Sequence, residues 1–90
     1  MITKNIKFID AYAFAFMKGI KPTLDLSDTN VETISGHAFA GNSITNIHLP
    51  KSILRIGPNA FSTCTELRTI IFDGHPADIR MLAFKNCSEL

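Results

Sequence analysis

The residues that could carry out chemistry in this chain are two cysteines, Cys64 and Cys87, and three histidines, His37, His48 and His75. Nucleophilic catalysis by a thiol needs an imidazole within hydrogen-bond reach in a cleft. A zinc site needs four ligands that converge, and no Cys or His pair here has the short C-x-x-C or H-x-x-x-H spacing that brings ligands together. The chain also has no glycine-rich phosphate loop and no G-x-S-x-G elbow. We therefore predict no metal site and no cofactor.

The composition places the chain among ordinary globular domains. Its 90 residues allow one domain, with 46% hydrophobic residues and 19% charged residues. A formal net charge of +1 gives no overall attraction to nucleic acid, which we exclude as a partner. The chain has no run of eighteen apolar residues, so no membrane span is predicted. The N-terminal segment has no continuous apolar stretch, and no signal peptide is expected in this chain.

An internal repeat organises the sequence. The pattern of Ile, three residues, Ala and Phe occurs four times, and its phenylalanines are Phe14, Phe39, Phe61 and Phe84. A fixed period of two dozen residues is typical of solenoids, in which each unit buries its apolar flank against the next unit. The residues three positions after the phenylalanines are Met17, Asn42, Cys64 and Cys87.

Short strands separated by turns are the elements expected within each unit. Apolar residues alternate with polar ones over 23–27, 46–50 and 69–73, which predicts three strands that stack in parallel. A second, brief extended segment is expected over 6–9, 31–34, 53–56 and 76–79. One helical turn is expected to follow it at Ala-Phe-x-x-Cys. No stretch has a helical period long enough for a repeat built from helices.

The repeat bears on the chemistry of the cysteines. Cys64 and Cys87 share a column with Met17 and Asn42, next to the phenylalanines, so they are expected to be buried and unreactive. A disulfide between them is geometrically conceivable, but parallel inward side chains favour free thiols. We predict that the chain is not an enzyme and has no catalytic residues.

The motif is similar to that of a known family. Residues 56–72 follow the pattern I-x-x-x-A-F-x-x-C-x-x-L-x-x-I-x-L-P most fully, with Phe72 in place of the last Leu, and this pattern resembles the BspA-like leucine-rich repeat. The resemblance implies a mainly β fold, a short right-handed solenoid with a parallel sheet of about three to four rungs. It also implies a non-catalytic role in binding partner proteins, at the cell surface or in secreted proteins of bacteria and some protists.

The repeats divide the single domain, residues 1–90, into four units. An atypical N-terminal repeat covers about 1–26, because Met17 stands where Cys or Asn stands later, and it is followed by repeats of about 27–49 and 50–72. A partial repeat covers 73–90 and stops at Leu90, where a fourth strand would open. We expect either truncation of a longer array or a small protein that covers its end by self-association.

The outward face of the predicted strands is the candidate binding surface for a protein partner of unknown identity. Residues on adjacent rungs are neighbours there, because they lie 23 residues apart. Such a ladder is where solenoids commonly bind; the alternative is a solvated face without function. Asp25 beside His48 is expected to be able to form an ion pair. The candidate residues are Thr23, Asn46, Thr69, Asp25, His48 and Ile71.

A second hypothesis is structural. Apolar side chains of the last unit, together with unpaired strand edges, would drive association of one chain with another and make a homo-oligomer through the C-terminal end. The residues are Ile79, Leu82, Phe84 and Leu90.

Overall fold

Seven short strands are found within the residues that the computed structural model describes, which are 5–17, 23–75, 78–80 and 82–90. Pro76, which opens the fourth expected extended segment, lies outside these residues. The strands are β1 (Phe8–Ile9), β2 (Thr23–Asp25), β3 (Thr33–Ile34), β4 (Asn46–Leu49), β5 (Arg55–Ile56), β6 (Thr69–Phe72) and β7 (Asp78–Ile79).

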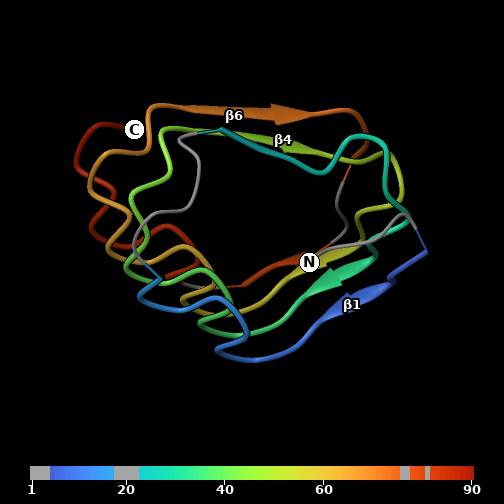
Figure 1. The fold of residues 1–90 in the computed structure, drawn as a ribbon, viewed down its shortest axis with the longest axis horizontal. Helices are drawn as coiled ribbons and strands as arrows, with labels where there is room; N and C mark the ends of the chain where they lie inside the picture. Colours follow the sequence, from blue (N-terminus) through green and yellow to red (C-terminus); the bar gives the residue numbers. More distant parts are fainter. Residues whose placement is uncertain (1–4, 18–22, 76–77, 81) are drawn as a thin grey trace.

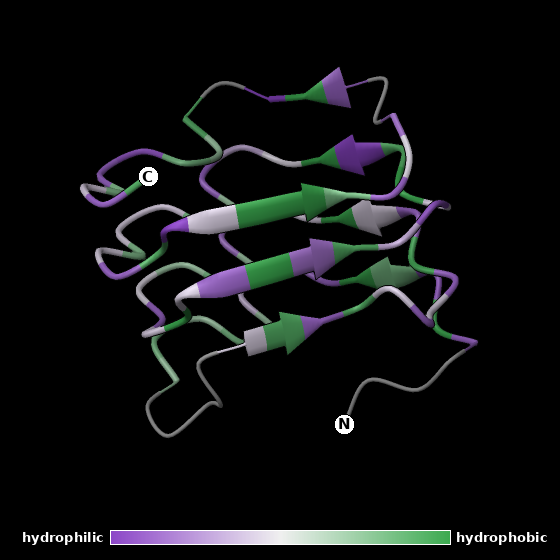
Figure 2. Ribbon diagram, turned by 90° about the horizontal axis from the view of Figure 1, so that it is seen from above, coloured by the Kyte–Doolittle hydropathy of each residue, from purple (hydrophilic) through white to green (hydrophobic). Residues whose placement is uncertain are grey.

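The strands form two parallel sheets on opposite sides of a coil. One sheet has the order β2-β4-β6 and the other the order β1-β3-β5-β7. Figure 1 looks through the coil, with β4 and β6 along one side and β1 along the other. Figure 2 shows the strands of each sheet stacked as successive rungs. The predicted β solenoid with parallel stacked strands is confirmed, and the brief extended segments form a second sheet.

The alternation of apolar residues decides which side chains enter the coil. In β4, Ile47 and Leu49 are buried while Asn46 and His48 remain partly accessible. The strands end one or two residues earlier than predicted. Pro50, the last residue of the predicted strand 46–50, lies beyond the end of β4 and is fully buried.

The expected helical turn around each phenylalanine is wrong, and the described residues contain no helix. Residues two before and two after each phenylalanine have positive φ in all four units, for example His37 and Gly41 around Phe39. Left-handed residues interrupt a right-handed helix. The Phe39 amide also donates to the Ala60 carbonyl oxygen of the next unit, at 2.8 Å. It is therefore not available for a hydrogen bond within a helix. A chain of β-turns results.

The four repeat phenylalanines stack in a single file through the core. The ring centroids of Phe14 and Phe39 are 5.2 Å apart, those of Phe39 and Phe61 are 5.3 Å apart, and those of Phe61 and Phe84 are 5.5 Å apart. The planes of neighbouring rings differ by 7° or less, an offset-stacked arrangement that is favourable for aromatic pairs. Phe39 and Phe61 are fully buried, whereas the two outer rings are half-buried.

The rungs approach so closely that their backbones touch. A Cβ atom built on Gly57 would lie 2.7 Å from the Gly36 amide nitrogen and 2.9 Å from the Ser35 carbonyl carbon. Real Cβ atoms do not come this close to backbone atoms, so a side chain at position 57 would push two rungs apart.

Removing an inner ring should destabilise the fold more than removing an outer one. We expect Phe61→Ala to lower the free energy of unfolding by about 3–5 kcal/mol, since it removes a fully buried ring with neighbours on both sides. Phe14→Ala should cost less, because Phe14 has a ring on one side only. Urea denaturation followed by circular dichroism measures both. Phe8→Ala is the control, since Phe8 is 61% exposed and should change little; equal losses at positions 14 and 61 would contradict the stacking.

Candidate functional site

The outward residues of the sheet β2-β4-β6 form two cross-strand columns. Thr23, Asn46 and Thr69 are paired in register across the three strands, as the repeat spacing predicted. The second column contains Asp25, His48 and Ile71, again directly paired. All six candidate residues therefore lie on one face, three rungs deep; their role in binding stays a prediction.

His48 lies between two carboxylates that come from different rungs. Its Nε2 atom is 2.8 Å from Asp73 Oδ1, and its Nδ1 atom is 3.7 Å from Asp25 Oδ1. The expected approach of Asp25 and His48 is found, but the hydrogen bond is to Asp73. The hydrogen bond to Asp73 orients the imidazole, and the Asp25 carboxylate lies near its other ring nitrogen.

Asp73 was missed as a partner of His48 although the sequence contains the signal. Asp73 lies one rung and two residues beyond His48, and residues two apart in an extended segment point to the same side. Diagonal neighbours across strands are within reach of long side chains. The sequence-based prediction paired His48 only with the directly opposite Asp25.

Asp25 is held by Ser27 rather than by His48. The Ser27 hydroxyl donates a hydrogen bond of 2.6 Å to Asp25 Oδ1, and the Ser27 amide donates a second one of 2.9 Å. These bonds stabilise the ionised carboxylate and lower the pKa of Asp25, with a smaller contribution from His48. The surface therefore presents a carboxylate with a fixed position at the edge of the ladder.

Ile71 adds an apolar group to this polar surface. Its side chain is 48% exposed, beside His48 in the same column. This face therefore combines one exposed apolar side chain with several hydrogen-bonding groups.

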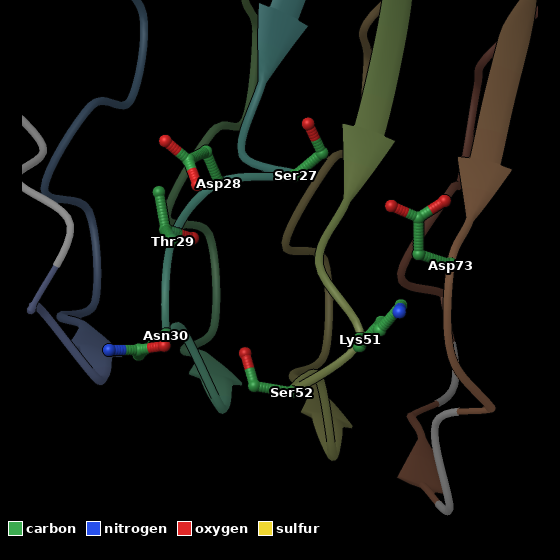
Figure 3. A pocket seen from close by; sticks show the side chains of 7 residues that line it. All are labelled: Ser27, Asp28, Thr29, Asn30, Lys51, Ser52 and Asp73. Carbon is green, nitrogen blue, oxygen red and sulfur yellow. The ribbon is translucent and has the colours of Figure 1, made fainter.

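A polar cleft of about 320 Å³ lies where the loops leave this sheet. Figure 3 shows the loops after β2, β4 and β6 side by side, each of them carrying side chains that line the cleft. Two of its hydroxyls donate inward, Thr29 Oγ1 to the Leu26 carbonyl oxygen and Ser52 Oγ to the Val31 carbonyl oxygen, both at 2.7 Å. Sequence reasoning did not find this cleft, because loop residues do not follow the repeat. It is lined by Ser27, Asp28, Thr29, Asn30, Lys51, Ser52 and Asp73.

Comparison with protein families identifies the repeat. A family model described as "BspA type Leucine rich repeat region (6 copies)" matches residues 1–90. The chain belongs to this family. No curated protein and no solved structure gave a match. BspA-type leucine-rich repeats generally bind proteins and are typically non-catalytic.

The cysteines of this BspA-type repeat donate hydrogen bonds to backbone carbonyl oxygens of the neighbouring rung. Cys64 Sγ is 3.3 Å from the Phe39 carbonyl oxygen, and Cys87 Sγ is 3.1 Å from that of Phe61. Asn42 does the same one rung earlier, since its Nδ2 atom donates to the Phe14 carbonyl oxygen at 2.8 Å. Both thiols are free, and Cys64 is buried as expected, whereas Cys87 in the last unit is only partly buried. Asn42, Cys64 and Cys87 thus each donate a hydrogen bond to the carbonyl oxygen of the phenylalanine on the preceding rung.

This environment makes the thiols poor nucleophiles. Burial penalises the thiolate and raises the pKa of Cys64 to about 11, and burial also raises the pKa of Cys87. A reactive cysteine needs the opposite shift. No group of three or more His, Cys, Asp or Glu that could hold a metal ion is found in the described part of the chain. The described residues also contain no helix that is long and apolar enough to cross a membrane.

The four residues proposed for self-association all lie in the last unit. Ile79, Leu82 and Leu90 are exposed, and Phe84 is half-buried because its ring stacks on Phe61. These residues do not lie on the outward face of the sheet β2-β4-β6. The two candidate sites are therefore separate.

The raised pKa of Cys64 should make the protein less stable in base. The thiol stays protonated in the folded state up to about pH 11, whereas the unfolded chain ionises near its ordinary value of 9.0. The protonated Cys64 thiol therefore contributes about 2–3 kcal/mol to the free energy of unfolding below pH 9, and this contribution is lost as the pH rises toward 11. Urea denaturation at several pH values should show a steeper loss for the wild-type protein than for Cys64→Ala. Equal slopes, or rapid alkylation of native Cys64 at neutral pH, would contradict this.

Proposed function

We propose that the outward face of the sheet β2-β4-β6 binds a protein partner, with Ile71 as its apolar anchor. The observation that carries the proposal is the column in which Ile71 lies exposed beside His48 and Asp25. Interface energy concentrates in a few side chains that become desolvated within a polar rim. Ile71 supplies the apolar centre, and the histidine and carboxylates supply the rim.

The polar groups of this face are ordered before any partner arrives. Hydrogen bonds hold the His48 ring against Asp73 and the Asp25 carboxylate against Ser27. A side chain that is already fixed loses little conformational entropy on binding. This order favours recognition of one partner geometry over nonspecific adhesion.

Binding without catalysis is the role that fits these residues. The face contains a histidine, carboxylates and threonine hydroxyls but no cysteine, and the thiols lie inward with raised pKa values. His48 is also committed to its two carboxylates. We therefore assign His48 and Asp25 to recognition.

Replacing Ile71 should weaken partner binding strongly. Ile71→Asp puts a charge where a partner would remove water, and we expect at least about a thirtyfold lower affinity, equivalent to about 2 kcal/mol. Proteins retained from an extract of the source cells by the immobilised wild-type chain are identified and then measured against each variant by surface plasmon resonance. His48→Ala should weaken the same interaction.

Leu54→Asp is the matched control. Leu54 is 44% exposed and precedes β5 in the opposite sheet, so the same chemical change is made at equal exposure on the other side of the coil. The proposal requires that this variant binds like the wild type. A partner whose affinity falls on Leu54→Asp and not on Ile71→Asp would assign binding to the other sheet.

A further inference from the structure

The first and the last rungs of the coil both expose apolar side chains. On the first rung these are Phe8, Tyr12 and Phe16, and on the last rung they are Ile79 and Leu82. We propose that a second copy of the chain docks head to tail, so that its first rung continues the stack beyond the last rung of the copy before it. The sheet face proposed to bind a partner takes no part in this contact.

The internal rungs give the register for such a contact. The amide of each of the first three repeat phenylalanines donates to an alanine carbonyl one rung ahead, at 2.8 Å in every case: Phe14 to Ala38, Phe39 to Ala60 and Phe61 to Ala83. The Phe84 amide has no such acceptor among the described residues. Continuing the pattern by one unit assigns it to the Ala13 carbonyl oxygen of the second copy.

A second row of amides repeats the same relation. Gly41 donates to the Ser62 carbonyl oxygen at 2.8 Å, and Thr63 donates to that of Lys85 at 2.7 Å. The next amide in this row belongs to Asn86, which has no acceptor among the described residues. In the same register, the Asn86 amide would donate to the Ala15 carbonyl oxygen of the second copy. Two amides without an acceptor in the described part of the chain thus match carbonyls of the first rung.

Side chains agree with this register. Phe84 would lie over Phe14 of the second copy and extend the ring stack, whose internal spacing is 5.2–5.5 Å. Leu82 would lie over Tyr12, an apolar contact between two exposed residues. The coil already uses this kind of interface three times between its own rungs.

Charge provides an independent match. Ile9, Ile34, Ile56 and Ile79 share one ladder, so the residue after each of them occupies one column. In this column Arg80 of one copy meets Asp10 of the next, and both are exposed. Within the described residues, Arg80 Nη1 has a long contact of 3.5 Å with Asp78 Oδ2. Opposite charges at the two ends favour head-to-tail contact over pairing of like ends.

A head-to-tail contact is heterologous, so it does not close after two copies. Pairing of two last rungs would instead leave the aromatic side chains of both first rungs in water. We therefore expect open chains that lengthen with concentration. In sedimentation velocity, the weight-average sedimentation coefficient of the wild-type protein should rise with concentration past the value of a dimer.

A charge exchange tests the register. Arg80→Asp and Asp10→Arg should each weaken association by about tenfold, because each variant brings like charges together at the contact. An equimolar mixture of the two variants should associate like the wild type, since each end then meets its opposite charge. Arg55→Asp makes the same charge change on an internal rung and should leave association unchanged. Circular dichroism confirms that each variant is folded.

Three results would overturn the proposal: a monomer at all concentrations, association that stops at a dimer, or a mixture of the two variants that associates no better than either alone. None of these results bears on the proposal that the outward face of the sheet β2-β4-β6 binds a partner. Loss of partner binding on Ile71→Asp is likewise independent of whether copies associate.

Discussion

The fold depends on a column of four phenylalanine rings held at a common spacing. Neighbouring ring planes in this column are within 7° of parallel, and their centroids are 5.2–5.5 Å apart. The spacing between strands of a sheet is about 4.7–4.9 Å, so rings that repeat once per rung must stack with a small offset. One ring per rung gives every unit the same height. Backbone hydrogen bonds between adjacent rungs then form in the same places in each unit.

The chemistry of the outer face follows from this regular stacking. Because the rungs are in register, Asp25, His48 and Ile71 become neighbours although they are 23 residues apart in sequence. Asp73 reaches His48 diagonally and fixes its ring. The surface thus combines three rungs, each of which supplies one kind of group: a carboxylate, an imidazole and an apolar side chain. No single repeat could present this combination.

Much of this arrangement could be predicted from the repeat itself. The spacing of the phenylalanines predicts the stack, and the period of two places Ile47 inside and His48 outside. The turns could not be predicted in the same way. Tyr12 and Thr63 have positive φ although residues of these types rarely adopt it, and the amide of each bonds to a carbonyl oxygen of the neighbouring rung.

The candidate site shows the same limit. Cross-strand neighbours at equal positions in the repeat were predictable, and Asp25 beside His48 is an example. The closer partner, Asp73, depends on how far the chain stays extended beyond β6, which the alternation leaves open. The polar cleft depends on the loops containing Asp28 and Lys51, whose residues differ from one repeat to the next. Contacts that repeat were therefore predictable, and contacts made by the loops were not.

The most direct test of the stack is a set of nuclear Overhauser effects between the rings, measured on protein with labelled phenylalanine. The account predicts cross-peaks between Phe14 and Phe39, between Phe39 and Phe61, and between Phe61 and Phe84. It predicts none between Phe14 and Phe61, which are separated by the ring of Phe39. Absence of the Phe39–Phe61 cross-peak in the folded protein, or a direct contact between Phe14 and Phe61, would contradict the single file on which the rest of the account depends.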